Sequence, residues 1–236
     1  RRGEHMVAAR FFIAAKDMMK AAEQLIAAGD MPKAVEALRR GGKADEAAGL
    51  FVERGEYLPA AKLYEEAGRH SEAAECYEKL GDVASQAKAL AAAGHGYKAG
   101  RVAFERGDFD EGLEYFEALG PLDTHYADAG LFRGQIYDRR GQLQEAADAY
   151  STFLKDRDPD GKNKVLFLRV AQIQEGIGRP RQALNILGRI ITSGLGTPDV
   201  TAWAARLERA TMDDVETEAL ENKQHTAAKL TPKRRG

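Results

Sequence analysis

The chain has 236 residues, of which 44% are hydrophobic, and its 35 lysines and arginines nearly balance its 37 aspartates and glutamates. A formal net charge of −2 gives no electrostatic basis for binding nucleic acid, so we do not expect that class of partner. The single cysteine, Cys76, excludes an internal disulfide framework and favours a reducing, cytoplasmic compartment, and the absence of a long apolar run argues against membrane insertion.

Glycines recur every thirteen residues through the first half of the chain. Gly3 fits the phase, Lys16 interrupts it, and the series continues at Gly29, Gly42, Gly55, Gly68, Gly81, Gly94, Gly107 and Gly120. In each unit, small residues follow the glycine by five and six positions, and a large apolar residue follows it by nine. These spacings trace one face of an α-helix, and their strict recurrence predicts a repeat architecture.

Each thirteen-residue unit is predicted to form one short helix. The glycine ends the helix in a conformation with positive φ, and acidic residues such as Asp30, Asp82 and Asp108 begin the next helix. A helix of about ten residues is not stable alone, so two units should form a hairpin and the hairpins should stack.

Two units depart from this pattern. Lys16 either takes the left-handed conformation or allows the first two units to fuse into one helix from about His5 to Ala27, and we favour fusion because no helix breaker lies between. The unit from Gly94 to Arg106 contains the extra glycines Gly96 and Gly100. We interpret it as a weakened helix at a bend, with a partner-contacting notch as the alternative.

A longer repeat begins after Gly120 and Pro121. Gly134, Tyr137, Gly141, Ala146 and Tyr150 stand at successive spacings of three, four, five and four residues, and a weaker copy follows at Phe167, Val170, Ala171, Gly178, Ala183 and Leu187. In the second copy Gln174 stands where the pattern expects an aromatic residue. Over roughly residues 125–195 this pattern resembles the tetratricopeptide (TPR) repeat, a helical hairpin of about 34 residues.

The resemblance implies an all-α fold: a TPR-like α-solenoid of stacked antiparallel helical hairpins that coil into a right-handed superhelix. We expect a short-helix array over 1–121, truncated at its N-terminus, and two TPR-like hairpins over 122–196. A capping helix should follow over 197–211, with Trp203 and Leu207 facing the array, and a flexible polar tail over 212–236.

The same resemblance assigns the surface that binds a partner. In TPR proteins the first helix of each hairpin lines a concave groove. The corresponding positions of this chain are Asp128, Leu131, Gln135, Asp138, Arg139, Val165, Leu168, Gln172 and Glu175.

The sequence offers little for catalysis, cofactors or metals. The run Asp156, Asp158, Asp160 and Gly161 matches the opening of a calcium loop, but Phe167 occupies the position of the final acidic ligand. A polar turn between hairpins is the simpler interpretation. The five histidines lack zinc-ligand spacing, and Cys76 falls at a semi-buried position of a helix.

We therefore expect a non-catalytic scaffold or adaptor for protein–protein interaction, which binds a peptide segment or a folded protein and needs no cofactor or metal. The alternative is a structural spacer or a module that assembles with itself through an exposed terminal repeat.

Overall fold

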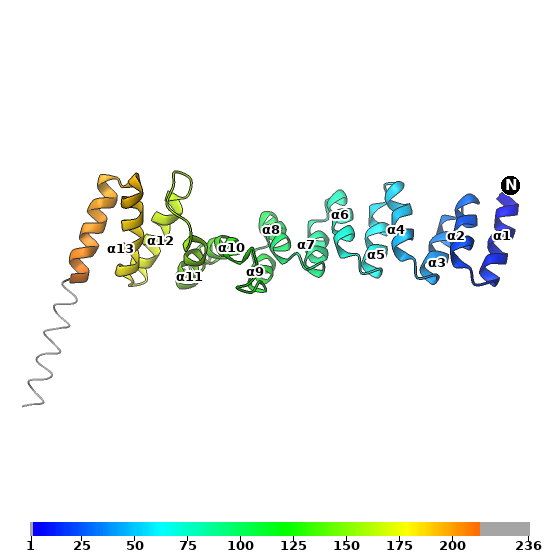
Figure 1. Cartoon of the computed structure of the whole chain (residues 1–236), viewed down its shortest axis with the longest axis horizontal. Coiled ribbons are helices and arrows are strands. Elements are labelled where there is room, and N and C mark those ends of the chain that lie inside the picture. The colour runs from blue at the N-terminus through cyan, green and yellow to red at the C-terminus, as the bar shows by residue number, and fades with distance from the viewer. Residues whose placement is uncertain (1, 213–236) are drawn as a thin grey trace, which may run out of the picture. The chain divides into compact units, whose positions relative to one another are not determined.

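The computed structural model describes residues 2–212, and within this range it contains helices and no β-strand (Figure 1). Two compact units divide the chain, Arg1–His125 and Tyr126–Gly236. The first unit holds α1 (Arg2–Ala14), α2 (Met18–Ala27), α3 (Met31–Arg40), α4 (Ala44–Glu53), α5 (Tyr57–Glu66), α6 (His70–Leu80), α7 (Val83–Ala92), α8 (Gly96–Arg106) and α9 (Phe109–Glu117). The second holds α10 (Tyr126–Arg139), α11 (Leu143–Leu154), α12 (Lys164–Gly176), α13 (Pro180–Ile190), the π-helical segment η1 (Ile191–Leu195) and a helix over 198–212.

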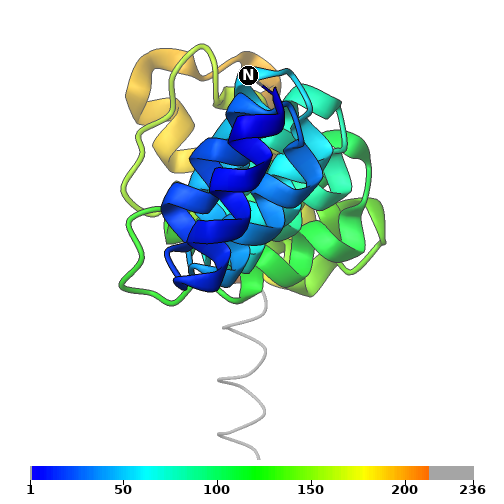
Figure 2. The ribbon, with the colours of Figure 1, turned by 90° about the vertical axis from the view of Figure 1, so that its right-hand side faces the viewer.

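Helices of the first unit stack in chain order. Each one packs against the next with its direction reversed, and Figure 2 shows α1 in front with the following helices of the unit behind it. The expected all-α fold of stacked antiparallel helical hairpins is therefore confirmed. The predicted tail lies outside the described residues, except for Met212, and the predicted domain boundaries and superhelix handedness stay predictions.

One hydrogen-bonded turn connects the short helices, as the link from α2 to α3 illustrates. Gly29, at φ 75°, donates its N–H to the carbonyl of Ile26 at 2.9 Å. Asp30 donates its N–H to the carbonyl of Leu25 at 2.9 Å, which completes a Schellman motif. The side chain of Asp30 then accepts the N–H of Lys33 at the start of α3. One residue thus ends one helix and begins the next.

The two backbone hydrogen bonds of this turn recur at every link in the array, whereas the side-chain cap forms at Asp17, Asp30 and Asp82. The second hydrogen bond is donated by Asp17, Asp30, Lys43, Glu56, Arg69, Asp82, His95 and Asp108. In the unit of α2, for example, the thirteen-residue period consists of ten helical residues, a C-cap, the glycine and the residue that also begins the next helix. The thirteen-residue period therefore contains one helix together with both of its caps.

Alanine pairs let the short helices approach one another closely. Ala47 and Ala48 of α4 and Ala60 and Ala61 of α5 are all 0% exposed. Leu25 belongs to the same core as Ala47 and Ala48, at the large apolar position of its unit. The core of this unit thus consists of small side chains on the helix faces, with larger ones near the helix ends.

The predicted fusion of the first two units is wrong. The α1 helix ends at Ala14 and α2 begins at Met18, and Lys16 between them has φ 60°. Lys16 and Asp17 donate their N–H groups to Ile13 and Phe12, as glycine and its successor do in the other links. The turn uses backbone groups alone, so a non-glycine residue can complete it at a conformational cost.

Two glycines have roles that differ from the expectation. Gly120 does not end a helix in the left-handed conformation, since α9 already ends at Glu117 and Gly120 lacks a positive φ. Gly100 lies inside the continuous α8, where a Cβ would come within 2.6 Å of the Phe116 ring. Close packing of an aromatic ring, rather than a break in the helix, explains this glycine.

The second unit has longer helices around a larger core. Gly141 and Gly178, at φ 71° and 76°, end α10 and α12 by the same turn. Tyr150 packs against the glycine face of α10, where a Cβ on Gly134 would come within 2.4 Å of its ring. Leu207 of the final helix is buried in the core of this unit, and Trp203 packs against that core.

The left-handed residue of the first link gives a direct test. Replacing Lys16 by glycine should raise the free energy of unfolding by about 1 kcal/mol, because glycine takes a positive φ without the Cβ clash. The reciprocal change Gly29→Lys should lower it by about the same amount, since the space around Gly29 is open and only the conformation is unfavourable. Urea denaturation followed by circular dichroism measures both. A Lys16→Gly variant no more stable than the parent would contradict this account.

Candidate partner-binding surface

The predicted groove positions lie on two helices of the second unit. The α10 helix carries Asp128, Leu131, Gln135, Asp138 and Arg139, and the α12 helix carries Val165, Leu168, Gln172 and Glu175. Each of these helices is the first of a hairpin, as the repeat pattern requires.

Acidic residues of this set join neighbouring elements. Asp138 of α10 accepts two hydrogen bonds from Arg169 of α12, at 2.9 Å from Nε and 2.6 Å from Nη2. Asp128 pairs with Arg157, which follows α11, at 2.5 Å. Asp138 thus links α10 to α12 and Asp128 links α10 to the segment after α11, so a partner could use these carboxylates only in competition with the arginines.

Glu175 makes the same kind of link at the end of α12. Its carboxylate accepts the indole N–H of Trp203 at 2.6 Å and pairs with Arg206 at 2.8 Å. Both partners lie in the final helix, so this carboxylate fastens that helix to the hairpin. Trp203 and Arg206 could not have been assigned this role from repeat positions alone, since they lie outside the two repeat copies.

Apolar members of the set divide into packed and exposed side chains. Leu131 and Leu168 pack against the core of the second unit, whereas Val165 is 75% exposed. Gln172 and Arg139 are exposed and Gln135 is half-buried. Val165 and Gln172, both on α12, are thus the members of the set best placed to contact a partner.

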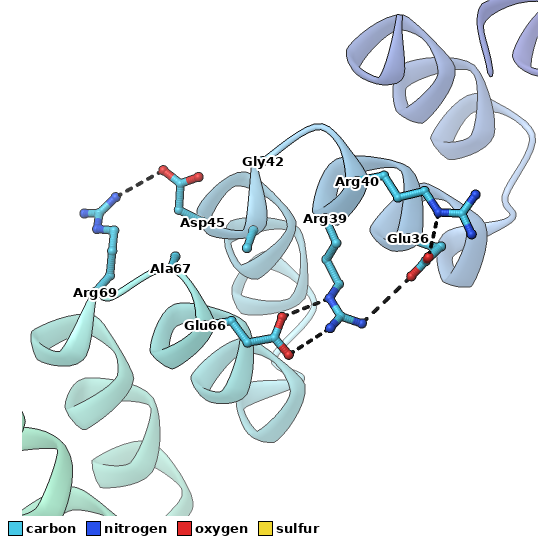
Figure 3. A pocket seen from close by; sticks show the side chains of 9 residues that line it. Glu36, Arg39, Arg40, Gly42, Asp45, Glu66, Ala67 and Arg69 are labelled. Carbon is cyan, nitrogen blue, oxygen red and sulfur yellow. Dashed lines mark hydrogen bonds and ion pairs between the residues drawn. The ribbon is translucent and has the colours of Figure 1, made fainter. Parts of the chain in front are cut away.

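A hollow of about 680 Å³ in the first unit was not anticipated from the sequence (Figure 3). It lies where α3 ends and α4 begins, and the end of α5 forms its far wall. Arg39 of α3 and Glu66 of α5 face each other across it, with two hydrogen bonds of 2.9 and 3.1 Å. The nearest sequence signal is the glycine pair Gly41 and Gly42 in the link between α3 and α4.

The charges in this hollow balance one another. Arg40 pairs with Glu36 at 2.8 Å, and Arg69 lies 3.7 Å from Asp45. Three carboxylates and three guanidinium groups line the hollow, and its ion pairs are largely exposed to solvent. Such pairs contribute little to stability and leave no uncompensated charge to attract an ion. We therefore assign no anion or metal site here.

The acidic loop before α12 is organised by its own backbone. The carboxylate of Asp160 accepts the N–H groups of Lys162 and Asn163 at 2.7 and 2.8 Å, and the bonds from Asn163 and Lys162 lower its pKa. The side chain of Asn163 in turn accepts the N–H of Asp160 at 2.8 Å. Within residues 2–212, no group of three or more potential ligands is arranged to hold a metal ion.

Cys76 lies inside the short-helix array. Its side chain is buried among the alanines of α5 and α6, and burial raises the pKa of its thiol. A raised pKa lowers the thiolate fraction at neutral pH, so the environment does not activate this cysteine as a nucleophile.

Comparisons with known proteins find similarity among solved structures. No protein-family model matches the chain, and no curated protein matches it. Among solved structures, it is similar to the APC/C hetero-tetramer Cut9-Hcn1 at 14% identity and a TM-score of 0.36, covering 88% of this chain and 46% of the other. It is also similar to a tetratricopeptide repeat protein from Parabacteroides merdae ATCC 43184 at 18% identity and a TM-score of 0.31, covering 99% and 94%.

A third similar structure contains nearly identical TPR-like repeats from Podosopora anserina, at 16% identity and a TM-score of 0.34, covering 84% of this chain and 97% of the other. The chain thus spans less than half of the Cut9-Hcn1 chain that it matches. At these identities and TM-scores the likeness carries no information about a binding site or a partner. No helix in the described part of the chain is both long and apolar enough to cross a membrane.

Tyr150 should make the second unit sensitive to alkaline pH. Burial raises the pKa of its phenol to about 12, against an ordinary value of 10. The folded chain therefore retains this proton at a pH where the unfolded chain loses it. The contribution of the protonated phenol to the free energy of unfolding is complete below pH 10 and is lost as the pH rises to about 12.

Between these values, the free energy of unfolding should fall by about 2 kcal/mol more in the parent than in Tyr150→Phe. Chemical denaturation at a series of pH values measures the difference. Burial also raises the pKa of Tyr115 in the first unit to about 12, so Tyr115→Phe should remove a separate part of the alkaline loss and leave that of Tyr150 in place. An equal alkaline loss in the parent and Tyr150→Phe would show that this phenol is not the group that titrates.

Proposed function

We propose that this chain is a non-catalytic scaffold or adaptor, which binds a peptide segment or a folded protein on the surface formed by α10 and α12. The observation that carries the proposal is the ion pair between Asp138 and Arg169, which fixes these two first helices relative to each other. A surface fixed in this way loses little conformational freedom on binding. Cytoplasmic location belongs to the same proposal and is supported by the lone, unpaired Cys76.

Exposed side chains beside the ion pair suggest what the surface accepts. Val165 offers an apolar contact and Gln172 an amide, both on α12, while the acids of the surface are engaged with arginines. A partner segment with apolar and neutral polar groups therefore suits it better than a strongly charged one.

Changing the exposed contacts should remove the partner without unfolding the chain. Val165→Glu combined with Gln172→Lys should reduce capture of a partner by roughly tenfold, because important contact residues contribute more than about 1 kcal/mol. Glutamate is well tolerated in the first turn of α12. The measurement is affinity capture from extract, followed by titration of the purified partner.

Arg181→Glu, in the first turn of α13, is the matched control because it also adds an acid to an exposed helix start. It should leave capture unchanged. Equal loss of capture in the control, or no loss of capture in the double variant, would contradict the assignment of the binding surface to α10 and α12.

A second candidate function, self-association, is favoured by the outer face of α1. The eighth position after the unit glycine is occupied by Ala37 in α3, Leu63 in α5 and Ala89 in α7, which are 4%, 6% and 2% exposed. Phe11 holds that position in α1 and is 70% exposed, with Val7 beside it at 68%. A second copy that packs here would cover α1 as the interior helices are covered.

Self-association should then depend on Phe11. Phe11→Lys should shift a concentration-dependent dimer to monomer in sedimentation equilibrium, and Leu58→Lys, at another exposed apolar residue, should not. A parent chain that stays monomeric at high concentration would exclude this function.

A further inference from the structure

A groove of about 460 Å³ in the first unit lies between α6 and α8. The α7 helix packs against both of these helices and contributes the part of the lining that lies between them (Figure 1). We call this hollow the α6–α8 groove, and its main lining residues are Glu75 and Glu78 of α6, Leu90 of α7, and Lys98, Arg101 and Val102 of α8. It shares no residue with the hollow around Arg39, so it is a separate surface.

Two apolar side chains in the α6–α8 groove are incompletely covered by the chain. Val102 holds the eighth position of its thirteen-residue unit and is half-buried, whereas Cys76 at the same position of α6 is 4% exposed. Leu90 holds the ninth position of its unit and is also half-buried, whereas Tyr77 at that position is 5% exposed. The groove therefore presents apolar surface that another side chain could cover with a gain in free energy.

The charged side chains of the groove are unequally engaged. Arg101 donates to Glu105 on its own helix at 3.1 Å. Glu75 and Glu78 are exposed and lie one turn apart on α6, and in the described part of the chain neither forms a hydrogen bond or an ion pair. The same holds for Lys98 on α8. Two unpaired carboxylates against one unpaired ammonium favour a cation, and they favour it on the α6 side, since Lys98 repels it on the other.

A single type of side chain complements both the apolar surface and the unpaired acids. Arginine has an aliphatic stem that can lie along Leu90 and Val102 while its charged end reaches outward. Its planar guanidinium carries five N–H donors, so it can donate to Glu75 and Glu78 together. Lysine has the stem but offers a compact charge that matches two carboxylates less well.

We propose that the α6–α8 groove binds an arginine side chain from a segment of a protein partner. The stem covers Leu90 and Val102, and the guanidinium donates to the carboxylates of Glu75 and Glu78. The α8 side of the groove belongs to the unit from Gly94 to Arg106, for which a partner-contacting notch is the alternative to a bend. The inference rests on the proposed scaffold function and extends it by giving the first unit a binding surface with its own chemistry.

The test uses N-acetylarginine amide as the probe on the full chain, followed by NMR. It should give saturable shifts of the backbone signals of Glu75, Leu90 and Val102. N-acetylcitrulline amide has the same shape without the charge and should give no saturable shift. Methylguanidinium has the charge without most of the stem and should bind about tenfold more weakly.

Glu75→Gln combined with Glu78→Gln removes both charges with little change in size, and it should weaken binding of N-acetylarginine amide about tenfold. The matched control is Glu114→Gln combined with Glu117→Gln, because these two acids are exposed at the same spacing on α9 of the same unit. The control removes the same total charge and should bind the probe as the parent does. Circular dichroism should show equal helicity in both double variants.

No saturable shift in the parent, or equal weakening in the two double variants, would overturn the site. Equal binding of methylguanidinium would show attraction by charge alone and overturn the role of the groove, and equal binding of N-acetylcitrulline amide would overturn the role of the acids. Val165→Glu with Gln172→Lys changes the other surface. Loss of capture in that variant with intact probe binding, or the reverse, therefore distinguishes failure of the α6–α8 groove from failure of the proposed function.

Discussion

The short-helix array depends on one residue that serves two helices at each link. In the link from α2 to α3, Asp30 closes the Schellman turn with its backbone N–H and begins the next helix as its N-cap. No separate loop lies between the helices, so consecutive helices reverse direction within one turn. Their faces can then meet only if the side chains between them are small, and this is why alanine pairs such as Ala60 and Ala61 are 0% exposed.

The second unit solves the same packing problem with different chemistry. Its helices are longer, and a tyrosine packs against a glycine, as Tyr150 does against Gly134. Long-range polar links then fasten successive elements: Asp138 with Arg169, and Glu175 with Trp203 and Arg206. The acids in these links are the same ones that the repeat pattern assigns to partner binding. Specific pairing inside the unit therefore limits the chemistry that its surface offers to another protein.

Much of the fold could be predicted from the sequence because its determinants are local. Helix ends follow from glycines and cap residues a few positions apart, and the small and large residues of each unit mark the packed face. The link at Lys16 could not be predicted from a glycine pattern because its turn is made by backbone groups, which do not require glycine. The site was harder to predict, because Arg157, Arg169 and Trp203 lie 28 to 31 residues from their acidic partners. Gln174, by contrast, is recognisable in the sequence as a departure from the repeat.

The shared link residue also restricts how the array can change in length. One extra residue inside a short helix would rotate the residues that follow it in that helix by about 100° about the helix axis and turn the alanine face away from its neighbour. Insertion or loss of a whole thirteen-residue unit would keep each packed face in register but reverse the direction of every later helix. Two units together are therefore the smallest change in length that preserves both the packed faces and the helix directions. Variation in length should therefore occur in steps of two helices, whereas the turns at 118–125 and 155–163, which contain no shared residue, can accept single insertions.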